Sequence, residues 1–143
     1  MASDKLNVSV NNMKLVLDSK SFHNSGGEAN IHVKNGIVYK VYHEANKAIA
    51  INKIQELKAI DKTNILIPKD QIFDLKNKYI GFTMDYIENT LPLCKLFSNS
   101  FWTQNSITAN TILDLTKEMQ NTIQFIHDKK CLIVDCNDFN FLV

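Results

Sequence analysis

Short runs of apolar residues alternate with polar ones through the first two thirds of the chain, and this period of two predicts β-strands. Met13–Leu17 (MKLVL) is expected as the first strand, and Ser21–Asn24 as a short extended piece. Two pairs of β-rich runs follow, each divided by a short stretch that favours a turn, and Asn-Gly in the first is a strong hairpin signal. The predicted hairpins join Ile31–Val33 to Ile37–Tyr42 through Lys34-Asn35-Gly36, and Gln71–Asp74 to Tyr79–Asp85 through Lys76-Asn77-Lys78.

Helical spacing appears in three other segments. Ala45–Ile60 carries Ala50, Ile54 and Leu57 at that spacing, and Leu91–Phe97 is expected as a short helix after Pro92. The clearest helix is predicted over Thr111–His127, where one face is apolar throughout: Ile112, Leu115, Met119, Ile123 and Ile126.

The region from Phe101 to Ala109 is polar and receives no assignment. Strands, a helix, more strands and then helices indicate an α+β protein with an antiparallel sheet rather than alternating βαβ units. No repeat or Pro/Gly-rich linker interrupts the chain, which therefore reads as one continuous unit.

Composition narrows the function classes. The chain has 143 residues and a net charge of +1, and all of its 16 basic residues are Lys. We therefore expect neither nucleic-acid nor membrane binding. The 3 Cys form no CxxC pair and the 4 His no ligand pattern, so neither a disulfide framework nor a zinc site is indicated. A reducing, cytoplasmic location is the expectation.

Three segments could carry chemistry. Ser25–Asn30 (SGGEAN) is a glycine-led loop that could bring backbone N–H groups to a phosphate, or could be a simple turn. Lys40 lies in an apolar strand, where its ammonium either points to water or needs an anion. Asp135–Asn140 gathers acidic and amide groups suited to a general base and a hard cation, or to a polar turn.

The order of these segments resembles a protein kinase. The closest match is Ile126–Val143 (IHDKKCLIVDCNDFNFLV), which carries H-x₇-D-x₄-N-x-L-V and is similar to the end of the kinase E helix and the catalytic loop. GGEAN followed by VYKVYH looks like the GGEG and V-x-K-I-Y pattern of a divergent set of bacterial and phage kinase-like proteins. The resemblance covers residues 21–143.

This resemblance implies a kinase-like N-lobe with its hinge over residues 21–87, after an N-terminal extension and first strand over 1–20. Residues 88–143 would begin a C-lobe with a short D helix, the E helix and the catalytic loop. ATP and Mg²⁺ are the implied cofactors. The implied site residues are Gly26 and Gly27 over the phosphates, Lys40 at the α/β-phosphates, Asp85, Tyr86 and Ile87 in the hinge that begins at Met84, Asp135 as catalytic base and Asn140 as magnesium ligand.

The chain also departs from the kinase pattern. Ala29 stands where GGEG has its third glycine. Val134 precedes Asp135 where kinases have Arg, and Asn137 replaces the usual Lys. Glu56 is the expected helix carboxylate for Lys40, and Glu44 is the alternative.

Three functions remain open. The first is the ATP-binding part of a phosphotransferase that acts on a hydroxyl, of Ser/Thr type, with a protein as one class of substrate. The chain stops at Val143, before any D-F-G aspartate, so we expect an incomplete C-lobe and no activity from these residues alone. The second is a non-catalytic, pseudokinase-like module that binds a nucleotide or a protein, with self-association through the exposed face of the 111–127 helix. The third is an unrelated α+β binding domain.

Overall fold

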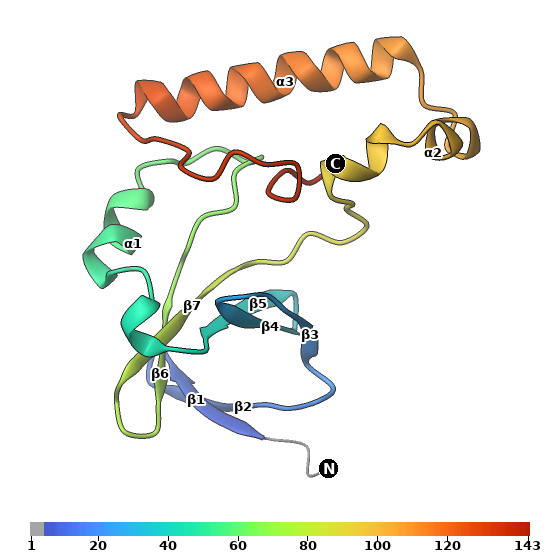
Figure 1. The fold of residues 1–143 in the computed structure, drawn as a ribbon. Helices are drawn as coiled ribbons and strands as arrows, with labels where there is room; N and C mark the ends of the chain where they lie inside the picture. Colours follow the sequence, from blue (N-terminus) through green and yellow to red (C-terminus); the bar gives the residue numbers. More distant parts are fainter. Residues whose placement is uncertain (1–4) are drawn as a thin grey trace. The chain divides into compact units, whose positions relative to one another are not determined.

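The computed structural model describes residues 5–143. The chain divides into two compact units, residues Met1–Ile87 and Glu88–Val143 (Figure 1). The first unit contains the sheet and two short helices, and the second contains helices and a terminal loop. The elements of the first unit are β1 (Leu6–Val10), β2 (Met13–Leu17), β3 (Phe22–Ser25), β4 (Ala29–Lys34), β5 (Ile37–Tyr42), η1 (Ala45–Lys47), α1 (Ile51–Leu57), β6 (Gln71–Asp74) and β7 (Tyr79–Asp85).

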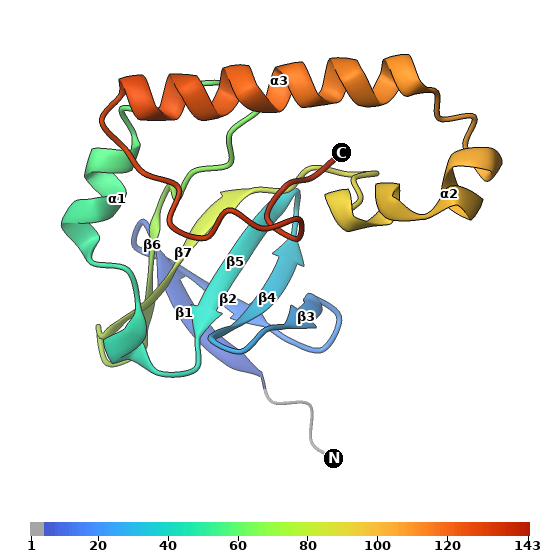
Figure 2. The same ribbon diagram turned by 45° about the horizontal axis from the view of Figure 1, so that its top comes forward.

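The seven strands form one curled antiparallel sheet in the order β2-β1-β6-β7-β5-β4-β3. In Figure 2, β5 lies between β4 and β7 near the middle of this sheet. The architecture is therefore α+β with an antiparallel sheet, as the order of patterns predicted.

Both predicted hairpins are confirmed, and their turns explain why. Asn35 and Gly36 have positive φ angles of 53° and 73°, and Asn77 has one of 63°. Asn and Gly tolerate this left-handed backbone, which the two-residue Asn35-Gly36 turn requires at both positions and the longer β6–β7 turn adopts at Asn77. Local turn chemistry therefore fixes β4–β5 and β6–β7.

The sequence prediction missed one strand and shortened another. β1 precedes the strand expected to be first, and it pairs with both β2 and β6. Its turn to β2 is made by Asn11 and Asn12, with φ angles of 49° and 64°. β4 begins at Ala29, so Ala29 and Asn30 belong to a strand and not to the glycine loop.

The expectation of one helix over Ala45–Ile60 is wrong. The segment holds the short 3₁₀ turn η1 and the α-helix α1, which are separated at Ala48–Ala50; Ala48 and Ala50 have extended backbones, with ψ of 141° and 142°. These extended backbones end one element and begin the next, so the surroundings of the chain override the helical propensity of the alanines here.

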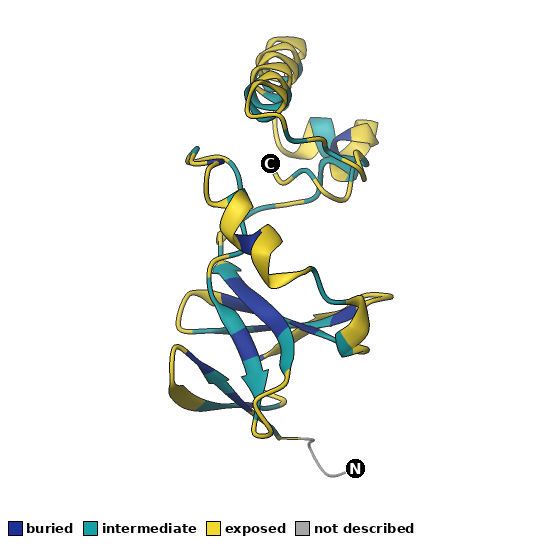
Figure 3. Ribbon diagram, turned by 90° about the vertical axis from the view of Figure 1, so that its left-hand side faces the viewer, coloured by how far each residue is buried: buried dark blue, intermediate teal, exposed yellow. Residues whose placement is uncertain are grey.

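The largest buried cluster of the first unit lies on one face of the curled sheet. Figure 3 shows the buried positions concentrated in the strands. The central cluster is formed by Val8, Val10, Leu17, Tyr39, Val41 and Ile72. Since Tyr39 and Val41 point into this cluster, the alternate residues of β5 lie on the opposite face.

The second unit contains η2 (Leu93–Phe97), α2 (Asn99–Gln104) and α3 (Ala109–Asp128). The predicted helix over 111–127 is confirmed as α3, and a capping box of Thr108 and Thr111 begins it. The short segment expected over 91–97 is a 3₁₀ helix, and α2 covers residues that received no assignment. No residue of α3 is buried (Figure 3). No helix within residues 5–143 is long and apolar enough to cross a membrane.

Candidate functional site

The glycine loop is the turn between β3 and β4. Gly26 N–H donates to the Ala29 carbonyl at 2.9 Å, and His43 Nε2 donates to the Gly26 carbonyl at 3.0 Å. His43 N–H also donates to the Glu28 carbonyl at 2.9 Å, so the end of β5 holds the loop. Neither Gly26 nor Gly27 has a left-handed φ, and a Cβ added at Gly27 would meet no atom within 4 Å. The fold therefore does not require glycine at position 27.

Lys40 lies on β5, on the face of the sheet opposite the core. It pairs with Ile31 of β4 on one side and Phe82 of β7 on the other. Its Nζ lies 5.4 Å from the ring centroid of Tyr42 and 5.8 Å from that of Phe82, within the range of cation–π attraction. Within residues 5–143, no carboxylate forms an ion pair with Lys40.

Both carboxylates proposed as partners of Lys40 bind other lysines. Glu56 Oε2 lies 2.8 Å from Lys53 Nζ on α1, and Glu44 Oε1 lies 2.6 Å from Lys47 Nζ. All four side chains are more than half exposed, at 56–59%. These are local i,i+3 pairs in water, which are weak.

The segment expected as the hinge covers the last residues of β7 and the two residues after it, at the end of the first unit. Asp85 pairs with Ile37 across the sheet, and its carboxylate lies 2.6 Å from Lys69 Nζ. The Tyr86 N–H donates to the Gly36 carbonyl at 3.2 Å. The β4–β5 turn therefore accepts a hydrogen bond from this N–H group of the expected hinge. Ile87 is the last residue of the first unit and is 40% exposed.

Asp135 and Asn140 contact each other in the terminal loop of the second unit. Asn140 Nδ2 donates to the backbone carbonyl of Asp135 at 2.9 Å and to its Oδ2 at 3.0 Å. Asn137 Nδ2 donates to Asp135 Oδ1 at 2.6 Å, and Asn137 Oδ1 accepts from the Phe139 N–H at 3.0 Å. Both carboxylate oxygens of Asp135 thus accept an amide hydrogen bond. The side-chain oxygen of Asn140, Oδ1, accepts no hydrogen bond within the loop.

The same loop is anchored to the start of the second unit. Leu91 N–H donates to the Val143 carbonyl at 2.9 Å, Val143 N–H donates back at 2.8 Å, and Pro92 and Leu142 form an antiparallel bridge. The loop itself carries exposed apolar side chains, including Val134 at 95% and Phe139 at 69%.

The oxygen ligands that the terminal loop offers would meet only part of what a magnesium ion needs. Magnesium sites normally combine one or two protein oxygen ligands with phosphate oxygens and water. Asn140 offers such an oxygen, and no group of three His, Cys, Asp or Glu side chains within residues 5–143 could hold a metal ion without other ligands. A magnesium ion at this loop would therefore need the oxygens of a phosphate ligand.

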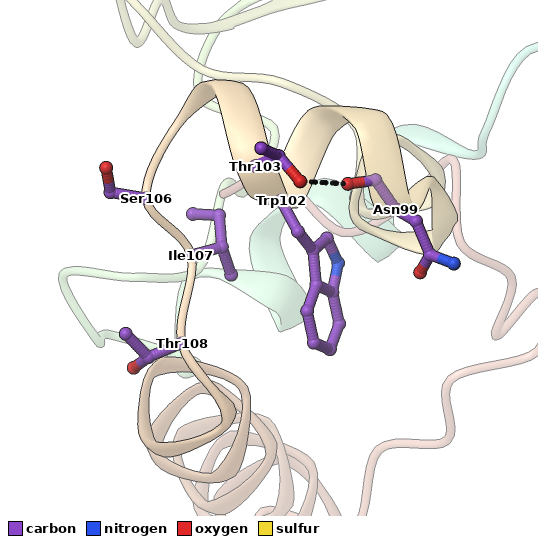
Figure 4. A pocket seen from close by; sticks show the side chains of 6 residues that line it. All are labelled: Asn99, Trp102, Thr103, Ser106, Ile107 and Thr108. Atoms are coloured by element: carbon purple, nitrogen blue, oxygen red, sulfur yellow. Dashed lines mark hydrogen bonds between the residues drawn. The ribbon is translucent and has the colours of Figure 1, made fainter.

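Concave surfaces lie elsewhere in each unit. A polar pocket of about 480 Å³ in the first unit lies between the β1–β2 turn and the end of α1, where Asn12 and Lys58 contribute to its wall. An open pocket of about 500 Å³ in the second unit lies between α2 and α3, with Trp102 and Ile107 in its wall (Figure 4). The Trp102 indole N–H donates to the Leu96 carbonyl. Sequence patterns gave no signal for either pocket.

The structure brings the predicted residues together in two groups. Gly26, Gly27, Lys40 and residues 85–87 lie on or next to the adjacent strands β3, β4, β5 and β7 of the first unit. Asp135 and Asn140 meet in the second unit. Sequence reasoning missed Tyr42 and Phe82 as neighbours of Lys40. The alternation of β5 could have indicated Tyr42, two residues from Lys40, whereas Phe82 depends on the strand order.

Comparison with known proteins adds no relative. No protein-family model matches the chain, and no curated protein is similar to it.

Proposed function

We propose that the chain is the ATP-binding part of a protein-kinase-like phosphotransferase. In this proposal the first unit binds the nucleotide, and the second unit supplies the base for transfer of the γ-phosphoryl group to a Ser/Thr-type hydroxyl. The proposal rests on the resemblance of residues 21–143 and on the geometry within each unit.

One observation carries most of the weight. Lys40 stands on the non-core face of β5 with Val38 two residues before it and Met84 opposite Val38 on β7. Val38 is buried, whereas Lys40 and Met84 are half-buried. A cation beside apolar side chains suits a ligand with a phosphate chain and an apolar ring. The glycine turn belongs to the neighbouring β3–β4 hairpin of the same sheet; its Gly26 N–H donates to Ala29, so the Gly27 N–H would be the group to receive a phosphate oxygen.

The terminal loop would provide the chemistry of transfer. The carboxylate of Asp135 would accept the hydroxyl proton as the hydroxyl oxygen forms its bond to the γ-phosphorus and the bond to the β-phosphate oxygen breaks. Asn140 holds this carboxylate through Nδ2 and would offer its carbonyl oxygen to Mg²⁺. Magnesium, when bound, would neutralise charge on the β- and γ-phosphates. Lys40 would do the same at the α/β-phosphates.

Nucleotide binding can be tested on the 143-residue chain by thermal denaturation with and without Mg²⁺-ATP. A ligand at one hundred times its Kd stabilises the folded state by about 2.7 kcal/mol. We expect wild type to show a raised Tm and Lys40→Met to lose this shift. Lys14→Met is the matched control, because Lys14 is exposed on β2. An equal shift in Lys40→Met and wild type would contradict the role of Lys40.

Phosphoryl transfer is tested separately in a version with a complete kinase-like C-lobe, with radiolabelled ATP and a Ser/Thr-containing acceptor protein. Asp135→Asn is expected to abolish any label transfer while the ATP-induced Tm shift remains. Cys136→Ser, at the exposed neighbour of Asp135, serves as the control. Transfer at the wild-type rate by Asp135→Asn would exclude Asp135 as the base.

The second candidate is a non-catalytic, pseudokinase-like module that binds a nucleotide or a protein. It is favoured by the hydrogen bonds of Asp135, since both carboxylate oxygens already accept amide N–H groups and are thereby held within the loop's own network. An ATP-induced Tm shift without label transfer from ATP to any acceptor, in the version with a complete C-lobe, would select this function.

A further inference from the structure

Lys40 has an unusual environment for a phosphate-binding lysine. Its ammonium contacts the rings of Tyr42 and Phe82, and it has no carboxylate partner within residues 5–143. A lysine side chain has many rotamers, so a ligand that binds the ammonium must also fix the side chain in one of them, at a cost in conformational entropy. A neighbour that already holds the ammonium in place would reduce this entropic cost.

The two rings are themselves held in place. They lie 6.2 Å apart between centroids at an angle of 60°, and Phe82 is buried. Tyr42 is half-buried at the end of β5 and pairs with Ala29 across the sheet. Strand pairing and the packing of its ring against Phe82 therefore hold the Tyr42 side chain.

We propose that Tyr42 and Phe82 position Lys40 for the nucleotide, in place of the helix carboxylate that a kinase-like site would use. This inference rests on the proposed nucleotide site. The ring faces attract the ammonium from one side, and its remaining N–H groups stay available to phosphate oxygens on the other. Glu56 and Glu44 keep their local partners and are not needed for binding.

Substitutions at Tyr42 separate this arrangement from a carboxylate pair. Tyr42→Leu is expected to weaken Mg²⁺-ATP binding about two- to fivefold, the equivalent of one exposed cation–π contact. Tyr42→Phe retains the ring and is expected to bind within about twofold of wild type, since a ring without the hydroxyl still attracts the ammonium. Glu56→Gln and Glu44→Gln are expected to leave the affinity unchanged.

A second measurement needs no nucleotide. Lysines labelled with ¹³C at the ε carbon would report the ring currents of Tyr42 and Phe82 as a displaced ε-CH₂ signal of Lys40, assigned with Lys40→Met. The displacement should disappear in Tyr42→Leu and persist in Tyr42→Phe and Glu56→Gln. Wild type could show the displaced ε-CH₂ signal of Lys40 and yet bind no ATP. This result would overturn the proposed function, while the contacts of Lys40 with the two rings would stand.

Two results would overturn the inference. One is a Lys40 signal that does not change in Tyr42→Leu. The other is ATP affinity that falls in Glu56→Gln or Glu44→Gln but stays at the wild-type level, or rises, in Tyr42→Leu. That pattern would show that a carboxylate, and not an aromatic ring, positions the ammonium.

Discussion

Replacing Gly81 by alanine perturbs the contact between β5 and β7, on which the surroundings of Lys40 depend. Gly81 pairs with Val41 of β5 and Ile72 of β6. A Cβ at this position would lie 2.0 Å from the Lys40 carbonyl oxygen and 3.0 Å from its carbonyl carbon. Both atoms belong to the backbone, so no side-chain rotation relieves the clash and a strand must move.

The expected loss of unfolding free energy depends on whether the added Cβ clashes with backbone or side-chain atoms. Adding atoms to a packed interior typically costs about 1–3 kcal/mol when side chains can adjust. Because the backbone of β5 must shift here, we expect Gly81→Ala to lose about 3 kcal/mol or more of unfolding free energy. A domain with a total stability of about 5–15 kcal/mol would remain folded or become marginal.

Gly27→Ala is the matched control. Gly27 has no left-handed φ and its added Cβ would meet no atom within 4 Å. Its unfolding free energy should differ from wild type by no more than about 1 kcal/mol, with a small gain from the restricted unfolded chain. Urea denaturation of the three 143-residue chains, followed by circular dichroism, measures the differences. If Gly81→Ala were as stable as Gly27→Ala with an unchanged m-value, the close approach of β5 and β7 would be refuted.

Two further predictions concern single groups in the first unit. Burial lowers the pKa of His32 from its usual 6.5, against the opposing charge of Asp18, so the unfolded chain takes up a proton that the folded chain refuses. The contribution of His32 to the unfolding free energy should therefore be fully present above pH 6.5 and be lost as the pH drops below it. Urea denaturation at pH 7.5 and 5.5 should show a smaller loss of unfolding free energy for His32→Gln than for wild type. An equal loss would rule out His32 as the cause. The Tyr79 hydroxyl is buried without a hydrogen-bond partner within residues 5–143, and burial, together with Tyr42, raises its pKa to about 12. Tyr79→Phe should raise the unfolding free energy by about 1 kcal/mol in the same assay, because it removes an unsatisfied polar group; a loss of stability would mean that the hydroxyl has a partner.

The hairpins could be predicted because their signals are local. Asn35 and Gly36 adopt the left-handed backbone that their side chains permit, and the strands on either side follow. The same logic applied to Asn11 and Asn12 would have found β1, since Leu6–Val10 alternates apolar and polar residues before that turn. The missed strand therefore reflects a signal that was present but not used.

The helix expected over Ala45–Ile60 could not be corrected from its own residues. Alanine favours helix, and Ile54 and Leu57 at helical spacing do lie in α1. The break falls at Ala48 and Ala50, whose backbones are extended although alanine favours helix. Propensity is a weak prior that tertiary context overrides.

Local sequence patterns also could not predict the neighbours of Lys40. Its place in a strand followed from its flanking residues, but Phe82 becomes its neighbour only through the pairing of β5 with β7. An exposed local pair such as Glu56–Lys53 contributes only about 0.3–0.5 kcal/mol, and an exposed cation–π contact about 0.5–1 kcal/mol. Because these energies are so similar, motif spacing alone does not predict whether a lysine contacts a carboxylate or an aromatic ring. Strand order and the fixed position of Tyr42 determine the partner. The glycine loop and Lys40 could therefore be located from the sequence, whereas the partner of Lys40 could not.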